Sequence, residues 1–381
     1  TSDPILSGLV NELYEYQISV EDPDDDYYYY YLNNAPQDMS INLQGLIQWI
    51  PSSTGLFEVE LSVYDDDSED GEYDTQTFSI DIKYQQSFAL HEGSNLISFI
   101  GLNENDNSIE TIFSDLSQNL THIFTENYAS ILLDDGTWFG SLDEIEPERG
   151  YWLRINNNDI FELTTYETPI DLVYSLHYGN NLISYVGNDG AQINDVLPNE
   201  IEQYFTDIFT ENLSATKNED GEWIGSLASI GLQHLKGYWV NVTQDLQFSY
   251  LDVDILSKNY NNDIPRFSVD QTPLELEYSQ SQLQAFYYIG NINIDGIPIT
   301  EDDWVVAYYN DIVVGARQWF GEYTDVPVMG DDGFIETSGY CEDDSVVNFK
   351  IYRSGTSEYI DLNGDIPKWS NLNNFIISSL N

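Results

Sequence analysis

Hydrophobic and polar residues alternate over long stretches of the chain, which is the pattern of β-strands that bury one face. Before residue 85 the alternation is clearest in YEYQISVED at 14–22, LFEVELSVYDDD at 56–67 and TQTFSIDI at 75–82. Turn-forming sequences separate these stretches, namely NNAPQD, PSSTG and DSEDGEYD. Short strands separated by turns in this way predict a β-sandwich over residues 1–84.

The stretch EDPDDDYYYYY at 21–31 joins a cluster of acids to a run of tyrosines. We expect PDDD to form a loop and the tyrosines to begin a strand, because a pleated surface accepts aromatic side chains on both faces. Alternate strand residues point to opposite faces, which divides the run into Tyr27, Tyr29 and Tyr31 on one face and Tyr28 and Tyr30 on the other. A core face with an amphipathic surface is the main interpretation, and a tyrosine face that stacks on a ligand is the alternative.

This first segment resembles the cadherin-like and immunoglobulin-like domains of bacterial surface proteins, the dystroglycan-type group. The resemblance covers nearly all of 1–84 and is carried by YQISVEDPDDD, YYLNNAPQDMSINLQGLIQWIPSSTGLFEVELSVYDDD and TQTFSIDI. It implies a seven-stranded sandwich that serves as a spacer or an adhesive module.

Residues 85–170 and 171–252 form an internal repeat, which we call repeat A and repeat B. Four blocks return in the same order at a shift of 85 to 87 residues: LHEGSNLISFIG as LHYGNNLISYVG, HIFTENYAS as DIFTENLSA, GTWFGSL as GEWIGSL, and RGYWLRI as KGYWVNV. Such self-similarity indicates two copies of one structural unit. Each copy is predicted to hold a strand, a glycine turn, a short helix and further strands, and the two copies are expected to pack together.

The last segment, 265–381, follows a polar linker at 253–264 and again carries paired strand patterns, such as DDWVVAYYNDIVVGARQW. It predicts another antiparallel sandwich, which we call the C-terminal module. The fold class expected for the whole chain is mainly β: several antiparallel β-sandwich domains in tandem, with short helices in the repeats.

The charge balance limits the partners that the protein can have. Eleven Lys and Arg stand against 67 Asp and Glu, which gives a net charge of −56. Such a field repels nucleic acid and anionic membrane, whereas salt or divalent cations would relieve the self-repulsion. Together with the absence of an apolar run of the ~20 residues that a membrane helix needs, this predicts a secreted protein at the cell surface and no membrane insertion. The single cysteine, Cys341, excludes an intrachain disulfide and is expected in the core.

Calcium is the predicted ligand of the acidic loops, because Ca²⁺ prefers six to eight carboxylate and carbonyl oxygens. Acids alternate in one loop and cluster in a second, and the cadherin-like resemblance implies a set made of Asp22, Asp24, Asp26, Asp65 and Asp67. The family more commonly has DPDGD in the first of these loops, whereas this chain has DPDDD at 22–26, with an aspartate in place of the glycine. A third loop, DLNGDIP, offers Asp361, Asn363 and Asp365 but lacks the closing Glu of an EF-hand. The alternative is that these acids are solvated surface charge.

Catalytic chemistry has little support in the sequence. No motif of a nucleophilic or metal-dependent enzyme is present, and His91 and His177 occupy equivalent positions in the two repeats, which favours a packing role. With 67 acids a carboxylate pair carries no information about glycoside hydrolysis. Recurrence also favours packing for the repeat tryptophans. The tryptophans of the C-terminal module do not recur and are candidates for a ligand-binding groove: Trp304, Trp319 and Trp369.

These observations predict a non-enzymatic extracellular structural or adhesive protein, stiffened by calcium, that assembles into a surface layer or filament. Self-association or other surface proteins would be its partners, and residues 1–8 could add a strand to a neighbouring subunit. The first alternative is a carbohydrate-binding or accessory module of a secreted polysaccharide-degrading system, with glycans as partners. The second alternative is a viral capsid or fibre protein.

Overall fold

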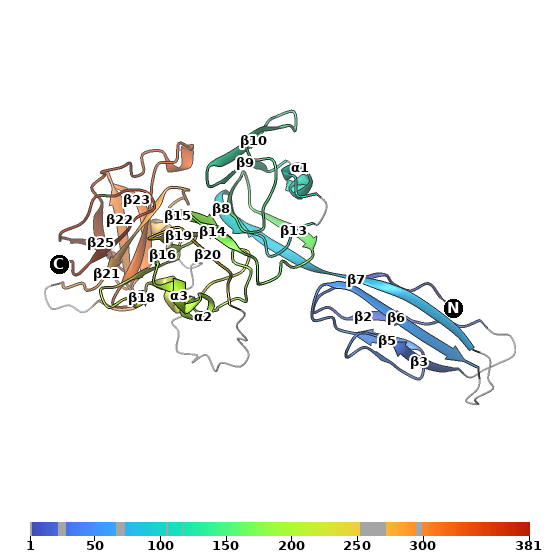
Figure 1. The fold of residues 1–381 in the computed structure, drawn as a ribbon. Helices are drawn as coiled ribbons and strands as arrows, with labels where there is room; N and C mark the ends of the chain where they lie inside the picture. Colours follow the sequence, from blue (N-terminus) through green and yellow to red (C-terminus); the bar gives the residue numbers. More distant parts are fainter. Residues whose placement is uncertain are drawn as a thin grey trace. The chain divides into compact units, whose positions relative to one another are not determined.

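The computed structural model (Figure 1) describes residues 2–21, 28–65, 73–103, 106–116, 118–251, 272–294 and 299–381. The fold is mainly β, with several antiparallel sheets and a few short helices, as the sequence predicts. The chain divides into two compact units. The first holds 1–87, 101–106 and 162–168, and the second holds 88–100, 107–161 and 169–381. The predicted linker at 253–264 lies outside the described residues.

The first unit contains two sheets, ordered β1-β7-β6-β3, with β13 also pairing β7, and β2-β5-β4. Their strands are β1 (Ser7–Leu9), β2 (Tyr14–Gln17), β3 (Tyr29–Asn34), β4 (Ser40–Ile41), β5 (Leu46–Trp49), β6 (Gly55–Tyr64) and β7 (Tyr73–Leu90). The alternation read from the sequence becomes the core, because every second residue of β6 and β7 points inward. The buried set includes Tyr14, Tyr16, Trp49, Val59, Leu61, Val63, Phe78, Ile80 and Ile82.

The described tyrosines of the run, 28–31, divide between the two faces of the sheet as predicted, whereas Tyr27 lies outside the described residues. Tyr28 and Tyr30 pack against the core, whereas Tyr29 and Tyr31 are exposed. Tyr31 meets Tyr64 of β6 edge to face, with ring centroids 5.5 Å apart. The outer face of this sheet is therefore partly aromatic.

The amino-terminal segment is used within its own chain. β1 pairs in parallel with β7, with Gly8 opposite Ile82. The hydroxyl of Tyr16 donates a 2.6 Å hydrogen bond to the carbonyl of Ser2, so the segment before β1 is also held against the sandwich. These contacts occupy the strand that was expected to join a neighbouring subunit.

In the second unit the repeats form two five-stranded sheets with the same strand order. Repeat A is ordered β11-β10-β9-β12-β8, and repeat B is ordered β18-β17-β16-β19-β15. The strands of repeat A are β8 (Gly93–Ser98), β9 (Leu120–Thr125), β10 (Tyr128–Leu132), β11 (Trp138–Gly140), β12 (Gly150–Ile155) and β13 (Asp159–Thr165). Those of repeat B are β14 (Tyr174–Leu176), β15 (Gly179–Ile183), β16 (Phe205–Phe209), β17 (Ser214–Lys217), β18 (Trp223–Ile224), β19 (Tyr238–Val242) and β20 (Leu246–Phe248). The helices are short: α1 (Ile109–Ile112), α2 (Ile193–Val196), α3 (Asn199–Glu202) and α4 (Ser226–Ile230).

The two repeats pack through reciprocal contacts, as the two halves of a symmetric dimer do. The amide of Ser98 donates to the carbonyl of Leu235, and the amide of Ser184, the equivalent residue of repeat B, donates to the carbonyl of Glu148; both distances are 3.0 Å. One apolar cluster unites equivalent residues of both copies: Leu96, Phe124 and Trp152 with Leu182 and Trp239. The internal repeat therefore forms one pseudo-twofold domain.

The C-terminal module contains two sheets, ordered β24-β21-β27 and β23-β22-β25-β26. Their strands are β21 (Gln284–Ile289), β22 (Trp304–Tyr309), β23 (Ile312–Gln318), β24 (Thr324–Met329), β25 (Asn348–Arg353), β26 (Glu358–Leu362) and β27 (Asn374–Ile377). Cys341 is fully buried in the core of this module, and burial raises the pKa of its thiol to about 12. This matches the expected packing role of the cysteine.

A buried carboxylate joins the C-terminal module to repeat B. Asp325 of β24 accepts hydrogen bonds from the hydroxyls of Ser214 and Ser226 at 2.7 and 2.6 Å, and from both of their amides. Burial raises the pKa of Asp325, although Arg317 and the serine donors oppose this effect. Next to it Phe209 packs with Phe286 and Tyr288. The module and the repeats consequently form one continuous body.

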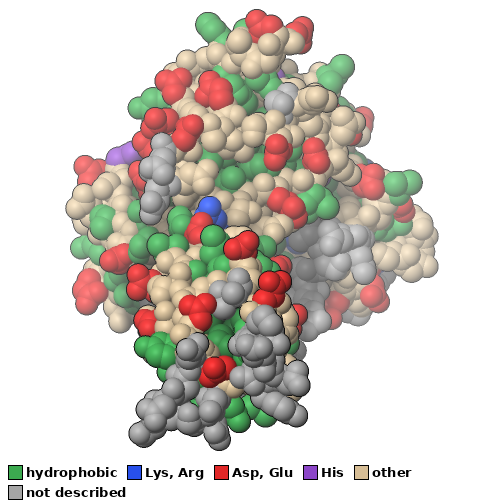
Figure 2. All heavy atoms as spheres, turned by 90° about the vertical axis from the view of Figure 1, so that its right-hand side faces the viewer, with side chains coloured by type: hydrophobic (Ala, Val, Ile, Leu, Met, Phe, Trp, Pro, Cys, Tyr) green, Lys and Arg blue, Asp and Glu red, His purple; other side chains and the backbone are tan. Residues whose placement is uncertain are grey.

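Acidic side chains are scattered over the face shown in Figure 2, where few basic ones are visible, as the composition requires. Among the described residues, none of the helices has both the length and the apolar character needed to cross a membrane.

Candidate binding pocket at the repeat interface

A pocket of about 620 Å³ opens where repeat A, repeat B and the C-terminal module meet. Each contributes a short group of lining residues: His91–Gly93 and Arg154 from repeat A; Glu211–Leu213, Gln233 and Lys236 from repeat B; and Thr272, Glu277–Gln280 and Glu336 from the C-terminal module. The volume lies within the range of about 300–1,000 Å³ that is typical of small-molecule sites. The pocket therefore has the size of a ligand site, and most of its lining residues are polar or charged.

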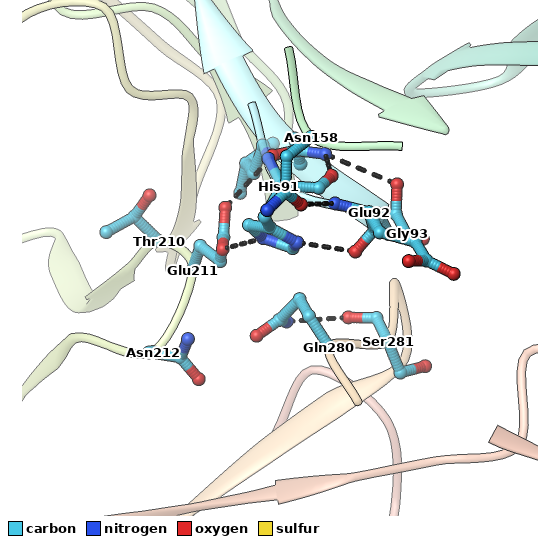
Figure 3. Close-up of polar contacts among 12 residues, drawn as sticks. His91, Glu92, Gly93, Asn158, Thr210, Glu211, Asn212, Gln280 and Ser281 are labelled. Atoms are coloured by element: carbon cyan, nitrogen blue, oxygen red, sulfur yellow. Dashed lines mark hydrogen bonds and ion pairs between the residues drawn. The ribbon is translucent and has the colours of Figure 1, made fainter. Parts of the chain in front are cut away.

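The glycine turn before β8 fixes the position of His91. Its backbone amide donates to Asn95 Oδ1 at 2.9 Å, and Asn95 Nδ2 donates back to the carbonyl of His91 at 2.8 Å. Gly93 has φ of +97°, a conformation that favours glycine. The repeated sequence LHxGxNLIS thus builds a rigid turn that presents the imidazole to the pocket (Figure 3).

Both ring nitrogens of His91 face acceptors. Nδ1 lies 2.7 Å from the carbonyl oxygen of Glu92, and Nε2 lies 2.6 Å from Glu211 Oε1 (Figure 3). A neutral imidazole has only one N–H, so it could satisfy only one of these two contacts. Burial lowers the pKa of His91, but the hydrogen bond and charge of Glu211 outweigh it, so that the pKa is raised. The geometry therefore suits the imidazolium form, which donates to both acceptors.

Glu211 is held as a carboxylate. Burial works to raise its pKa, but Lys236, His91 and the amide of Leu96 together lower it. The amide of Leu96 donates to Oε2 at 3.2 Å, so both carboxylate oxygens are engaged. Glu211, which is largely buried, and His91, which is partly exposed, thus form an ion pair across the repeat interface.

Two side chains attach the C-terminal module to the rim of the pocket. The guanidinium of Arg154 forms an ion pair with Glu336 and lies 3.6 Å from the ring centroid of Phe334, so that it packs against both residues. On the other side the hydroxyl of Tyr278 donates to Asn212 Oδ1 at 3.0 Å. Burial raises the pKa of Tyr278 to about 12, which keeps this phenol protonated.

Gln280 lines the floor with an unsatisfied acceptor. Its Nε2 donates to the carbonyl of Ser281 at 2.8 Å (Figure 3), whereas its Oε1 is buried without a hydrogen-bond partner among the described residues. A buried amide oxygen without a donor costs free energy unless a water or a ligand hydroxyl supplies the hydrogen bond.

The fixed charges of the lining nearly balance. With His91 protonated, three cationic groups face four carboxylates, listed as His91, Arg154 and Lys236 against Glu92, Glu211, Glu277 and Glu336. Neutral donors and acceptors lie among them, including Asn212, Ser279 and Gln280. Such a lining can hydrogen-bond a ligand that both donates and accepts, and it holds no excess of positive charge for an anion.

The predicted groove tryptophans lie in the core. Trp304, Trp319 and Trp369 are 7%, 8% and 2% exposed, and the indole N–H of Trp369 donates to the carbonyl of Val328 at 2.9 Å. All three belong to the apolar clusters of the C-terminal module, whose neighbouring side chains cover their rings, and they do not line an open groove.

The predicted calcium ligands are only partly described. Asp22, Asp24, Asp26 and Asp67 lie outside the described residues, and Asp65 has one buried oxygen, Oδ1, without a hydrogen-bond partner among those described. Asp361 lies on β26 and pairs with Lys350 at 3.1 Å. Asn363 exchanges backbone hydrogen bonds with Asn381, and Asp365 is exposed. In the part of the chain that the structure describes, no three acidic, histidine or cysteine side chains gather as a metal site, and calcium stays a prediction.

Sequence reasoning missed Glu211 and its equivalent Glu126. Both stand in the repeated block FTEN, and that recurrence was the available indication. The recurrence could not reveal that each glutamate contacts the other copy: His91 pairs with Glu211, and His177 pairs with Glu126.

No family model matches the chain, and no curated protein matches it significantly. Among solved structures, a match was found to the SGBP-B protein of the Bacteroides ovatus mixed-linkage glucan utilization locus, in complex with a mixed-linkage heptasaccharide. The match has 9% identity and a TM-score of 0.17, and it covers 99% of this chain and 67% of that one. Similarity at this level says nothing about what this chain binds.

Proposed function

We propose that this chain is a non-catalytic binding protein of the cell surface that holds a neutral, hydroxyl-rich ligand, a short saccharide, in the pocket at the repeat interface. The observation that carries the proposal is the lining itself. Cationic, anionic and neutral hydrogen-bonding side chains surround a volume of about 620 Å³. Sugar hydroxyls both donate and accept, so they match such a lining better than an apolar or a purely anionic ligand does.

Charge narrows the ligand class further. The lining carries a slight excess of carboxylates, and the whole chain has a net charge of −56. An anionic ligand would approach against this field, because long-range electrostatics set the local concentration of charged molecules. A neutral saccharide is indifferent to the field, so the charge of the chain does not oppose its approach.

The protonation states favour binding over catalysis. A histidine that donates from both nitrogens has no lone pair with which to act as a general base. Glu211 has a lowered pKa, so it is a poor general acid at neutral pH. We therefore interpret the His91–Glu211 pair as a structural element that fixes the shape of the pocket.

A structural role is the second candidate, and the continuous body formed by the repeats and the C-terminal module favours it. Under this proposal the first sandwich is a cadherin-like spacer stiffened by calcium, and the rigid second unit presents a surface for adhesion. Assembly into a layer or filament would use self-association or other surface proteins as partners. The two candidates are compatible, since a spacer can present a binding module.

The test is binding of neutral gluco-, manno- and xylo-oligosaccharides on an array, followed by calorimetric titration of any binder. Gln280→Ala should weaken binding about tenfold, because one hydrogen bond in a desolvated pocket is worth about 1.4 kcal/mol at most in the neutral case. Gln118→Ala, at an exposed position away from the pocket, is the matched control. An array without any neutral glycan bound would contradict the proposal.

A further inference from the structure

We infer that the chain carries a second saccharide site, in a pocket of about 330 Å³ that the pseudo-twofold relation of the repeats generates. This inference rests on the proposed function, because it assigns the same ligand class to an equivalent site.

The second pocket reproduces the central elements of the first. His177 takes the place of His91, Glu126 that of Glu211, and Arg149 that of Lys236, as the sequence blocks align. His177 Nε2 lies 2.6 Å from Glu126 Oε1, and its Nδ1 lies 2.8 Å from the carbonyl of Tyr178. The amide of Leu182 donates to Glu126 Oε2 at 3.3 Å, as that of Leu96 does to Glu211.

The charges of the second lining balance fully. Arg149 and a protonated His177 stand against Glu126 and Glu148. The contacts of His177 with the Tyr178 carbonyl and with Glu126 raise its pKa, as Glu211 does for His91. A balanced lining with donors and acceptors again suits a neutral polar ligand.

The two pockets differ in what completes them. The C-terminal module covers part of the first pocket, whereas residues of repeats A and B alone line the second. Where the first has Leu213, the second has Tyr128, whose side chain is 46% exposed. The Arg149 guanidinium lies 5.5 Å from the Tyr128 ring centroid and so orients the ring. An oriented, exposed aromatic ring is a stacking platform for a sugar.

The test is the stoichiometry of calorimetric titration with the neutral oligosaccharide that binds the whole chain. We expect two sites per chain. Tyr128→Ala should weaken one site about tenfold and leave the other unchanged, while Tyr128→Phe retains both because it keeps the ring. Tyr73→Ala, at an exposed tyrosine of β7 outside the pocket lining, is the matched control, and equal melting temperatures establish that the Tyr128 variants are folded.

The outcomes separate the two proposals. Hydrogen exchange with the oligosaccharide bound should slow at 126–128 and 174–177 as well as at 277–280. One site per chain, with Tyr128→Ala without effect and protection confined to 277–280, would overturn the second site and leave the proposed function intact. A chain that binds no neutral oligosaccharide would overturn both.

Discussion

His91 of repeat A and Glu211 of repeat B form an ion pair across the repeat interface, with Nε2 and Oε1 2.6 Å apart. The same pair recurs with the copies exchanged, between His177 and Glu126 at the same distance. Each repeat thus supplies one cation and one carboxylate to the other. Because both pairs also line the two pockets, the contacts that hold the repeats together are the ones that shape the candidate binding sites.

Glu211→Ala should destabilise the second unit. It removes the carboxylate that faces His91 and Lys236 and leaves the amide of Leu96 without its acceptor; because the His91 side chain is 43% exposed, we expect a loss of about 1–3 kcal/mol, less than for a fully buried pair. Urea unfolding, followed by tryptophan fluorescence, measures the change in the free energy of unfolding.

The pseudo-twofold relation supplies the control, Glu126→Ala. Its pair is more exposed, with side-chain exposures of 57% and 20% against 43% and 10%, and solvent screening weakens exposed pairs. We expect a clearly smaller loss for this variant. Equal losses for the two variants would contradict the burial argument.

Stability should fall as the pH rises through the pKa values of His91 and His177. Both are raised in the folded chain, so their contribution is complete below the unfolded pKa of about 6.5 and is lost as the pH rises through the folded values. Thermal melts between pH 5.5 and 9 would show a declining melting temperature.

The double variant His91→Gln, His177→Gln should flatten this decline. The pKa of His122 is lowered by burial and by Arg154, so this residue makes stability rise with pH. That rise should remain in the double variant and serves as an internal reference. A pH dependence that is unchanged in the double variant would refute the assignment of the slope to the two interface histidines.

Asp325→Asn should loosen the C-terminal module from repeat B. The amide replaces one of two acceptor oxygens by a donor, and this donor then faces serine hydroxyls and amides that donate. An unsatisfied buried group costs about 1–3 kcal/mol, and Arg317 loses its nearby charge. Calorimetry should record a lower melting temperature, with Asp311→Asn, at an exposed turn, left unchanged.

Calcium should raise the melting temperature of the chain more than magnesium or matched salt does, and EGTA should reverse the effect. A ligand that binds only the folded state stabilises it with the logarithm of its concentration relative to Kd. Asp65→Asn should reduce the response, since a buried oxygen of Asp65 lacks a hydrogen-bond partner among the described residues. An identical response to both cations would instead mark the acidic loops as solvated surface charge.

The sequence predicts strands wherever one face is buried, as in β6, where the buried Val59 and Leu61 alternate with the exposed Glu58 and the half-buried Glu60. It also predicts the repeats, because their blocks recur. It does not predict that His91 reaches Glu211 in the other copy, since recurrence marks equivalence but not contact. Nor does it predict Asp325 as an interface residue, because β24 is buried throughout and has no alternation to interpret.

The tryptophans illustrate a second limit. Trp304, Trp319 and Trp369 do not recur, and this alone could not distinguish a groove from a core. The packing of the C-terminal module places them inside, whereas the candidate pocket is lined by polar side chains from three distant parts of the sequence. Short-range patterns carry no information about such a convergence.

Hydrogen exchange of the whole chain with and without a neutral oligosaccharide tests the central claim most directly. The account predicts slower exchange at 277–280 and 211–213, where the C-terminal module and repeat B line the larger pocket, and loss of that protection in Gln280→Ala. Saccharide binding with protection elsewhere, or no binding by any neutral oligosaccharide, would contradict it.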